Sequence, residues 1–232
     1  MKDRIPLSAR MLVARVCAIR GWRDVAGRFG AGGLRAYIAG SVTARRWRQV
    51  EVGRDAQVHR GTVLHTNDDD AGPRILVGDR AFIGQNCFFS AGELIDVQRD
   101  CLIGASCNLL GAGHAYGDPG IPYARARIAS YGRITLGANT WIGTGSTIVG
   151  GVTVGFGTVV AAGTVLRCSV PALCLVAGNP GRILKIFDWQ TGTWHPLPNT
   201  ETEKQEALLR HLAQLPSQAN FLQRLNVTLS AS

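Results

Sequence analysis

Aliphatic residues recur at every sixth position along the C-terminal half of the chain. From residue 136 the series keeps one unbroken phase, through Leu136, Ile142, Ile148, Val154, Val160 and Leu166. The fourth residue after each aliphatic is small or β-branched, as in Thr140, Ser146 and Thr158. A period of six matches neither an α-helix, with about 3.6 residues per turn, nor an amphipathic strand, with about 2. It favours a coil of short strands joined by tight corners.

The same phrase occurs upstream in three shorter blocks. Their aliphatic or aromatic positions are Val52, Val58 and Leu64, then Val77, Ile83 and Phe89, then Val97, Ile103 and Leu109. One hexapeptide forms one face, and three faces form one turn of about 18 residues. We therefore predict an all-β fold, a left-handed parallel β-helix of hexapeptide repeats with about five turns. A β-sandwich or a glycine-rich α/β fold is the alternative.

The pattern also predicts where the coil is interrupted and how it is flanked. The phase breaks at His65–Leu76, near Glu93–Asp96 and over Leu110–Arg133. Residues 187–197, with two tryptophans around a glycine-containing turn, predict a hairpin. Thr200–Leu215 predicts an amphipathic helix with Ala207, Leu208, Leu212 and Leu215 on one side. We divide the chain into a basic segment at 1–50, a β-helix at 51–186 with its loop at 110–133, and an extension at 187–232.

Composition changes this picture mainly at the N-terminus. The net charge is +9, and the first 60 residues alone hold thirteen Lys/Arg against four Asp/Glu, so the remainder is balanced. That distribution argues against a uniformly basic, nucleic-acid-binding protein. Residues 5–20 predict a helix with Ser8 as N-cap, packed on the first coil. The alternative is contact with an anionic membrane surface or an acidic substrate.

Six cysteines lack CxxC or zinc-finger spacing, and three of them fill small-residue positions of the repeat. Buried, reduced thiols fit a cytoplasmic protein, either free in the cytoplasm or peripheral at the inner membrane. No apolar run reaches the roughly 18–20 residues of a membrane span, and no metal site is expected.

The candidate chemistry lies in the largest interruption. It begins Gly111-Ala112-Gly113-His114-Ala115-Tyr116-Gly117-Asp118. A histidine in such a loop can act as a general base near neutral pH. Acyl transfer from a thioester to an alcohol needs a base of this kind, and it needs no metal because the thioester is already activated. Solvated loop histidines are also common, so His114 alone is weak support for catalysis.

At this point the sequence resembles a known family. Residues 134–185, with Trp-Ile-Gly at 141–143 and Ala-Gly-Asn-Pro-Gly-Arg-Ile at 177–183, are similar to the C-terminal half of hexapeptide-repeat acetyltransferases. These include the maltose and galactoside O-acetyltransferases and the sugar O-acetyltransferases of exopolysaccharide and O-antigen pathways. With residues 77–119 added, the resemblance covers about 110 residues. The family commonly has His-Pro-x-Asp or His-Asp-x after the base, whereas this sequence reads His114-Ala115-Tyr116-Gly117-Asp118.

The resemblance implies a homotrimer that binds acetyl-CoA in a groove between neighbouring coils. It implies His114 as the base, Asn86 as the residue that positions the acceptor, and Trp141, Tyr116 and Asp118 as acceptor contacts. The positions that it implies for CoA binding are Gly143, Gly145, Ala162, Gly163, Arg167, Asn179, Pro180, Arg182 and Lys185. Arginine and lysine near phosphate groups are physically reasonable.

Four functions follow from these observations. O-acetylation of a sugar or glycan precursor is the main prediction, with acetyl-CoA as the co-substrate and no nucleic acid partner. The alternatives are an N-acetyltransferase of an amino-sugar nucleotide, a zinc carbonic anhydrase and a non-catalytic β-helix scaffold. The carbonic anhydrase would need three converging histidines, and the coils offer only His59 and His65.

Overall fold

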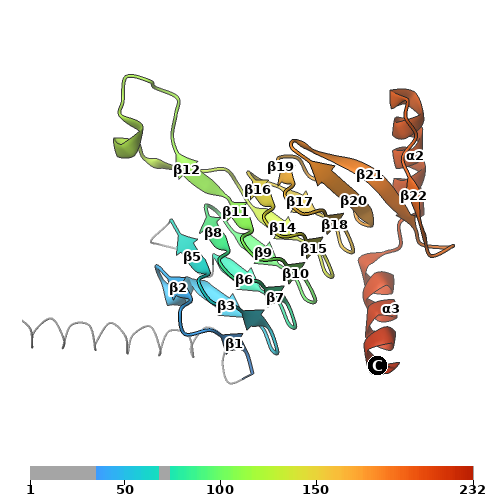
Figure 1. Ribbon diagram of the computed structural model, residues 1–232, viewed down its shortest axis with the longest axis horizontal. Coiled ribbons are helices and arrows are strands. Elements are labelled where there is room, and N and C mark those ends of the chain that lie inside the picture. Colours follow the sequence, from blue (N-terminus) through green and yellow to red (C-terminus); the bar gives the residue numbers. More distant parts are fainter. Residues whose placement is uncertain (1–34, 68–73, 232) are drawn as a thin grey trace, which may run out of the picture.

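In the computed structural model, which describes residues 35–67 and 74–231, the chain winds into a parallel β-helix with three faces (Figure 1). We refer to these faces as sheets A, B and C. Sheet A contains β1 (Tyr37–Ile38), β4 (Gln57–Val58), β7 (Phe82–Ile83), β10 (Leu102–Ile103), β15 (Trp141–Ile142), β18 (Val159–Val160) and β20 (Cys174–Gly178). Each coil runs from sheet A to B to C, which defines an A/B, a B/C and a C/A corner. The coil is left-handed, as the repeat predicts.

Sheets B and C complete the coil. Sheet B consists of β2 (Thr43–Ala44), β5 (Val63–Thr66), β8 (Phe88–Ala91), β11 (Asn108–Leu110), β16 (Thr147–Val149) and β19 (Val165–Leu166). Sheet C consists of β3 (Val50–Val52), β6 (Ile75–Val77), β9 (Ile95–Val97), β14 (Ile134–Leu136) and β17 (Thr153–Val154). All neighbouring coil strands pair in parallel, for example Ile103 with Ile142 and Ile142 with Val160.

The buried core confirms the six-residue period of the aliphatic positions. All six aliphatic residues of the long block are buried, as are all nine of the shorter blocks. The small residues beside the stack link coils through their hydroxyl groups. Ser146 Oγ donates to the carbonyl oxygen of Ala161 over 2.9 Å, and Thr158 Oγ1 donates to that of Pro171 over 2.8 Å. Burial of these hydroxyls is therefore compensated by hydrogen bonds.

The coil begins earlier than the boundary that we predicted at residue 51. Strands β1 and β2 already pair with β4 and β5, and they lie within the segment that we assigned to a separate N-terminal unit. The pattern is hidden there because Ala44 replaces a larger aliphatic residue. The 3-10 helix η1 (Trp47–Gln49) also shifts the phase between β2 and β3. The predicted helix at 5–20 lies outside the described residues, as does half of the 65–76 interruption.

A hairpin and two helices cover the C-terminal end of the coil (Figure 1). Strand β21 (Gly181–Asp188) folds back on β20, and β22 (Thr193–Pro196) pairs with β21, which confirms the predicted hairpin. Helix α2 (Glu201–Gln214) confirms the second prediction, although its buried residues are Ala207 and His211, whereas Leu212 is exposed. The sequence did not predict helix α3 (Gln218–Ala231). No helix within the described part is long and apolar enough to cross a bilayer.

Candidate functional site

The large interruption forms a two-stranded arm at the B/C corner. Strand β12 (Ala112–His114) follows β11 and pairs in antiparallel fashion with β13 (Ile128–Ser130), and the 3-10 helix η2 (Tyr123–Arg125) lies between them. The arm projects away from the coil at the upper left of Figure 1. His114 is the last residue of β12, opposite Ile128, and its side chain is exposed. The sheet at the base of the arm therefore fixes the backbone of the candidate base.

A backbone carbonyl orients the imidazole ring of His114. Its Nδ1 lies 3.1 Å from the carbonyl oxygen of Ala126. A carbonyl can only accept a hydrogen bond, so Nδ1 carries the proton in the neutral ring and Nε2 keeps its lone pair. Tyr131 also donates from its hydroxyl to the carbonyl oxygen of His114 over 3.5 Å. The geometry thus presents Nε2 as the proton acceptor.

Asp118 has a different local role. Its Oδ1 accepts a hydrogen bond from the N–H of Gly120 over 2.8 Å and closes a turn within the arm. The Ala126 carbonyl supplies the orientation that a carboxylate beside His114 would otherwise give. Tyr116 is 76 % exposed on the same arm. Contact of Tyr116 and Asp118 with an acceptor stays a prediction.

Most residues predicted to contact CoA lie along the A/B corner. Gly145 and Gly163 occupy equivalent positions in successive coils, and the N–H of Gly163 donates to the carbonyl oxygen of Thr144 over 2.9 Å. Their φ angles are +72° and +70°, and no atom lies within 4 Å of the place where a Cβ would be. Glycine adopts this left-handed conformation without steric cost. We call Gly143, Gly145, Ala162 and Gly163 the corner ledge.

Gly143 serves the stacking of the coils instead. A Cβ at this position would overlap the backbone nitrogen of Ala162 in the next coil. The ledge therefore combines one glycine needed for close coil contact with two that leave open space beside the corner. A narrow chain such as pantetheine could approach the backbone along this line.

Asn86 lies on the same corner, two coils nearer the N-terminus. Its φ is +56°, and its carboxamide covers Gly61 in the preceding coil. Asparagine tolerates the left-handed conformation better than most residues, so the corner explains this residue without a catalytic role. The whole of β8 separates Asn86 from the B/C corner, a span of about 13 Å at the usual rise of a strand. A positioning role beside His114 of the same chain has no support in this geometry.

A cleft of about 780 Å³ adjoins the C-terminal end of the ledge. It is bounded by the end of sheet B, by β21 and by α2, and its lining includes Cys168, Arg182, Lys204 and Gln205. Asn179 and Pro180 form the exposed β20–β21 turn nearby. Of the three basic residues predicted for the nucleotide end, Arg182 lines the cleft, whereas Arg167 and Lys185 are exposed beside it. The sequence pattern missed Lys204, because the register of α2 against β21 is a tertiary feature.

Trp141 lies two residues before the ledge, on the outer surface of sheet A. It is 51 % exposed, and its strand neighbours in the adjacent coils are Leu102 and Val159. Tyr37 and Leu102, in the same outward column, are also exposed. Trp141 is therefore part of an apolar strip on sheet A, which we define by Tyr37, Leu102 and Trp141.

Two of the buried thiols, those of Cys101 and Cys174, are poor nucleophiles. Burial raises the pKa of Cys101 to about 12, and it raises the pKa of Cys174 to about 12 as well. Both groups stay protonated at neutral pH, so neither can carry an acyl group as a thiolate. Cys168 is the one exposed cysteine within the described residues. That part of the chain also contains no group of three or more potential metal ligands.

Comparison with known proteins gives a consistent result. The family described as "Hexapeptide repeat of succinyl-transferase" matches residues 133–168. The hexapeptide-repeat-containing acetyltransferase VCA0836 from Vibrio cholerae O1 biovar eltor, solved with acetyl-CoA, is 32% identical and has a TM-score of 0.51. That match covers 58% of this chain and 69% of VCA0836.

A second solved structure supports the fold alone. A mutant of the N-acyltransferase AntD from Bacillus cereus, in complex with dTDP-4-amino-4,6-dideoxyglucose and coenzyme A, is 16% identical with a TM-score of 0.59. The match covers 78% of this chain and 90% of AntD. The same fold therefore recurs in another protein despite low sequence identity.

Proposed function

The chain belongs to the hexapeptide-repeat acetyltransferases, and on this premise we propose that it transfers an acetyl group from acetyl-CoA to a hydroxyl of a sugar or glycan precursor. The observation that carries the proposal is the 3.1 Å contact between His114 Nδ1 and the Ala126 carbonyl oxygen. It leaves Nε2 available as a base on an exposed arm. An alcohol needs such a base, because its proton must leave as the oxygen attacks.

The reaction follows from this arrangement. His114 Nε2 takes the proton of the acceptor hydroxyl while its oxygen attacks the thioester carbonyl. A backbone N–H stabilises the oxyanion of the tetrahedral intermediate. The intermediate expels the CoA sulfur, which receives the proton from the His114 imidazolium. Atoms and charge balance without a covalent enzyme intermediate.

The corner ledge and the adjoining cleft suit the donor. The open space at Gly145 and Gly163 admits the narrow pantetheine arm close to the backbone. The cleft beyond it carries Arg182 and Lys204, two cations suited to phosphate groups. We therefore assign the pantetheine arm of CoA to the ledge and its nucleotide end to the cleft.

A complete site needs two copies of the chain. The ledge lies at the A/B corner and His114 lies beyond the B/C corner, with sheet B between them. The apolar strip and the outward-facing Val63 and Phe88 lie on sheets A and B, the two faces that meet at the A/B corner, and Val63 and Phe88 are in coils nearer the N-terminus than the ledge. Packing of such strips between copies brings the arm of one chain to the ledge of its neighbour. This arrangement supports the homotrimer that the family resemblance implies.

The test is an acceptor panel with acetyl-CoA, in which product mass is measured directly. Mass detection is preferable to a thiol reagent, because the exposed Cys168 would react with that reagent. Transfer to hydroxyl sugars that requires His114 supports the proposal. Transfer confined to amino sugars, and retained in His114→Ala, would establish the N-acetyltransferase alternative instead. Absence of CoA binding would leave the scaffold alternative.

A further inference from the structure

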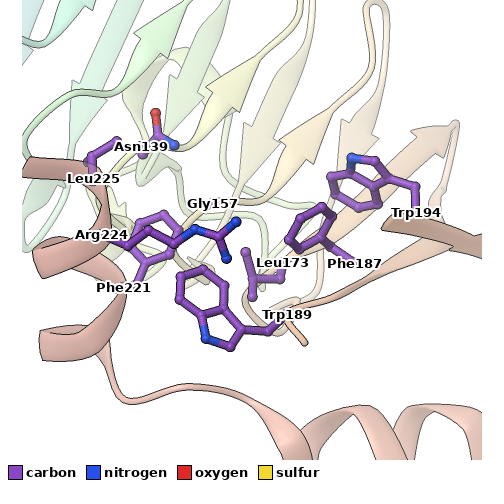
Figure 2. Close-up of a pocket in the computed structure, with 9 residues that line it drawn as sticks. All are labelled: Asn139, Gly157, Leu173, Phe187, Trp189, Trp194, Phe221, Arg224 and Leu225. Atoms are coloured by element: carbon purple, nitrogen blue, oxygen red, sulfur yellow. The ribbon is translucent and has the colours of Figure 1, made fainter. Parts of the chain in front are cut away.

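A separate cavity lies at the C/A corner, where the C-terminal hairpin meets α3 (Figure 2). Its volume is about 250 Å³. Phe187, Trp189 and Trp194 of the hairpin segment line it, together with Phe221 and Arg224 of α3 and Asn139 of the coil. We call it the cap cavity. Neither the ledge nor the arm contributes a residue to it.

Four aromatic rings line the cap cavity, together with Gly157, Leu173 and Leu225. The ring centroids of Trp189 and Phe221 are 5.9 Å apart with planes at 47°, and those of Phe187 and Trp194 are 5.2 Å apart at 61°. Phe221 is buried on the coil, whereas Trp194 is partly exposed at the far end. The two rings of each pair pack against each other, so a further flat ring can stack only on the faces that these contacts leave uncovered.

Two polar side chains approach the cavity. The guanidinium carbon of Arg224 lies 4.5 Å from the centre of the Trp189 ring. Figure 2 shows this guanidinium reaching across the cavity, and it shows Asn139 on the side away from Trp189. Among the described residues that line the cavity, none is acidic. The site therefore favours a ligand that is flat, aromatic and negatively charged.

This composition distinguishes between ligand classes. A sugar ring would bring several hydroxyl groups into a cavity with only two polar side chains, and unpaired buried hydroxyls weaken binding. A nucleobase has a flat face for the rings and a polar edge that an asparagine amide can pair with. Its phosphates would carry the negative charge that Arg224 attracts.

We propose that the cap cavity binds a nucleoside diphosphate, with the base between the aromatic rings and the phosphates at Arg224. The site lies on a different corner from the ledge. It is therefore separate from the donor site within one chain, and the proposal does not rest on the acyl transfer. The base can come from an adenine nucleotide or from a pyrimidine nucleotide, and both share the recognised chemistry.

The test is calorimetric titration of the full chain with UDP, ADP and inorganic pyrophosphate, in the presence of saturating CoA. CoA occupies the donor site, and the titrations are repeated without CoA because its own adenosine diphosphate part could enter the cap cavity. We expect one nucleoside diphosphate per chain, bound more tightly than pyrophosphate. Arg224→Gln is expected to weaken this binding at least about tenfold, since it removes charge-assisted contacts to phosphate. The preference between UDP and ADP identifies the base.

Arg210→Gln is the matched control, because Arg210 lies on α2, pairs with Glu206 at 3.9 Å and does not line the cap cavity. It should leave nucleotide binding within about twofold of the wild type. Three results would overturn the proposal. They are the absence of nucleotide binding below millimolar concentration, an equal loss of nucleotide affinity in Arg224→Gln and Arg210→Gln, and an affinity for pyrophosphate equal to that for the nucleoside diphosphates. Nucleotide binding that persists in a chain without acetyl transfer would support this proposal while the proposed function fails.

Discussion

At the residue scale, the corners decide which side chains the repeat accepts. Asn86, Ser106, Gly145 and Gly163 occupy the A/B corner of successive coils, and all four have positive φ. Most residues pay about 1–2 kcal/mol for this conformation, whereas glycine and asparagine adopt it more readily. The two coils nearer the N-terminus carry a side chain at this position, in Asn86 and Ser106, whereas the two coils nearer the C-terminus carry glycine. That difference leaves the ledge open.

Gly163→Asn tests whether this open space serves the donor. Asparagine suits the left-handed φ, so the substitution should cost about 1 kcal/mol of stability or less. Its side chain would fill the space at the ledge and raise the KM for acetyl-CoA at least about tenfold, equal to about 1.4 kcal/mol. Steady-state kinetics and thermal unfolding measure the two effects.

Gly192→Asn provides the control for this substitution. Gly192 has a φ of +72° and equally open surroundings, but it lies in the turn between β21 and β22. Its substitution should carry the same stability cost with no change in KM. An equal rise in the KM for acetyl-CoA in both variants would contradict the proposal that the ledge binds the donor.

At the element scale, ion pairs join neighbouring coils along the C/A corner. Arg35 pairs with Asp55 at 2.8 Å, and Arg80 pairs with Asp100 at 2.7 Å. Asp100 also accepts from Arg99 Nε over 2.9 Å. Burial raises the pKa of Asp100, but the hydrogen bonds from Arg80 and Arg99 outweigh burial, so this pKa lies below its ordinary value. The ionised Asp100 therefore stabilises the folded coil.

Asp100→Asn should lower the free energy of unfolding by about 1–2 kcal/mol at neutral pH, because two charge-assisted hydrogen bonds are weakened and solvent partly screens them. Asparagine also accepts the φ of +62°. The folded-state pKa is depressed, so the contribution is full above about pH 4 and disappears as the pH falls through the folded-state value. Denaturant unfolding from pH 7 to pH 3 should show the two stability curves converging.

Asp55→Asn is the comparison, since Asp55 shares the left-handed φ but its side chain is 49 % exposed against 11 % for Asp100. An exposed ion pair contributes about 0–1 kcal/mol, so this variant should change little. A larger loss for Asp55→Asn than for Asp100→Asn would refute the role of burial in the corner ion pairs.

Helix α2 provides a second test at this scale, because it forms one wall of the cleft that contains Cys168. Bound CoA should shield this thiol and slow its alkylation at least about fivefold, since the thiolate must be reached by the reagent. Mass spectrometry of the peptide that contains Cys168 isolates its rate from those of other cysteines. An unchanged rate at saturating CoA would remove the cleft from the donor site.

Most of the coil could be predicted from the sequence. Each coil places its inward-facing residue beside the equivalent residue of the next coil, so aliphatic residues recur at a fixed period. Every aliphatic position assigned from the repeat is buried. The start of the coil at Tyr37 was missed because Ala44 and the 3-10 helix η1 obscure the period. Helix α3 and the burial of His211 depend on contacts with corner residues far away in sequence, such as Phe156 and Ala172, and local periodicity does not encode those contacts.

The candidate site was less predictable. His114 could be found from its glycine-rich surroundings, but its orientation by the Ala126 carbonyl depends on the pairing of β12 with β13. Lys204 and the aromatic cap cavity arise only from tertiary packing. The role of Asn86 stays a prediction, since the corner geometry accounts for an asparagine there without testing a part in the chemistry.

At the scale of the whole molecule, separation of the ledge from His114 by sheet B predicts complementation between two impaired variants of the chain. His114→Ala and Gly163→Asn each damage a different half of the shared site. Assayed at acetyl-CoA well below the wild-type KM, where Gly163→Asn alone is slowed about tenfold, randomly mixed trimers should recover about a quarter of wild-type activity. Each site then has about an even chance of each intact half. Refolding the two variants together and separately, followed by an activity assay, measures this. Activity no higher than the mean of the separate variants would contradict a shared site.

The most direct test of the account is acetyl transfer by His114→Ala under saturating acetyl-CoA, compared with the wild type and with His195→Ala. His195 is an exposed histidine on β22 that contacts Thr193 and lies outside the arm, so its substitution should leave the rate unchanged. The account predicts that His114→Ala lowers kcat by roughly 10²–10⁴-fold while CoA binding is retained. Equal rates for the three proteins would contradict His114 as the general base and, with it, the proposed hydroxyl acetylation.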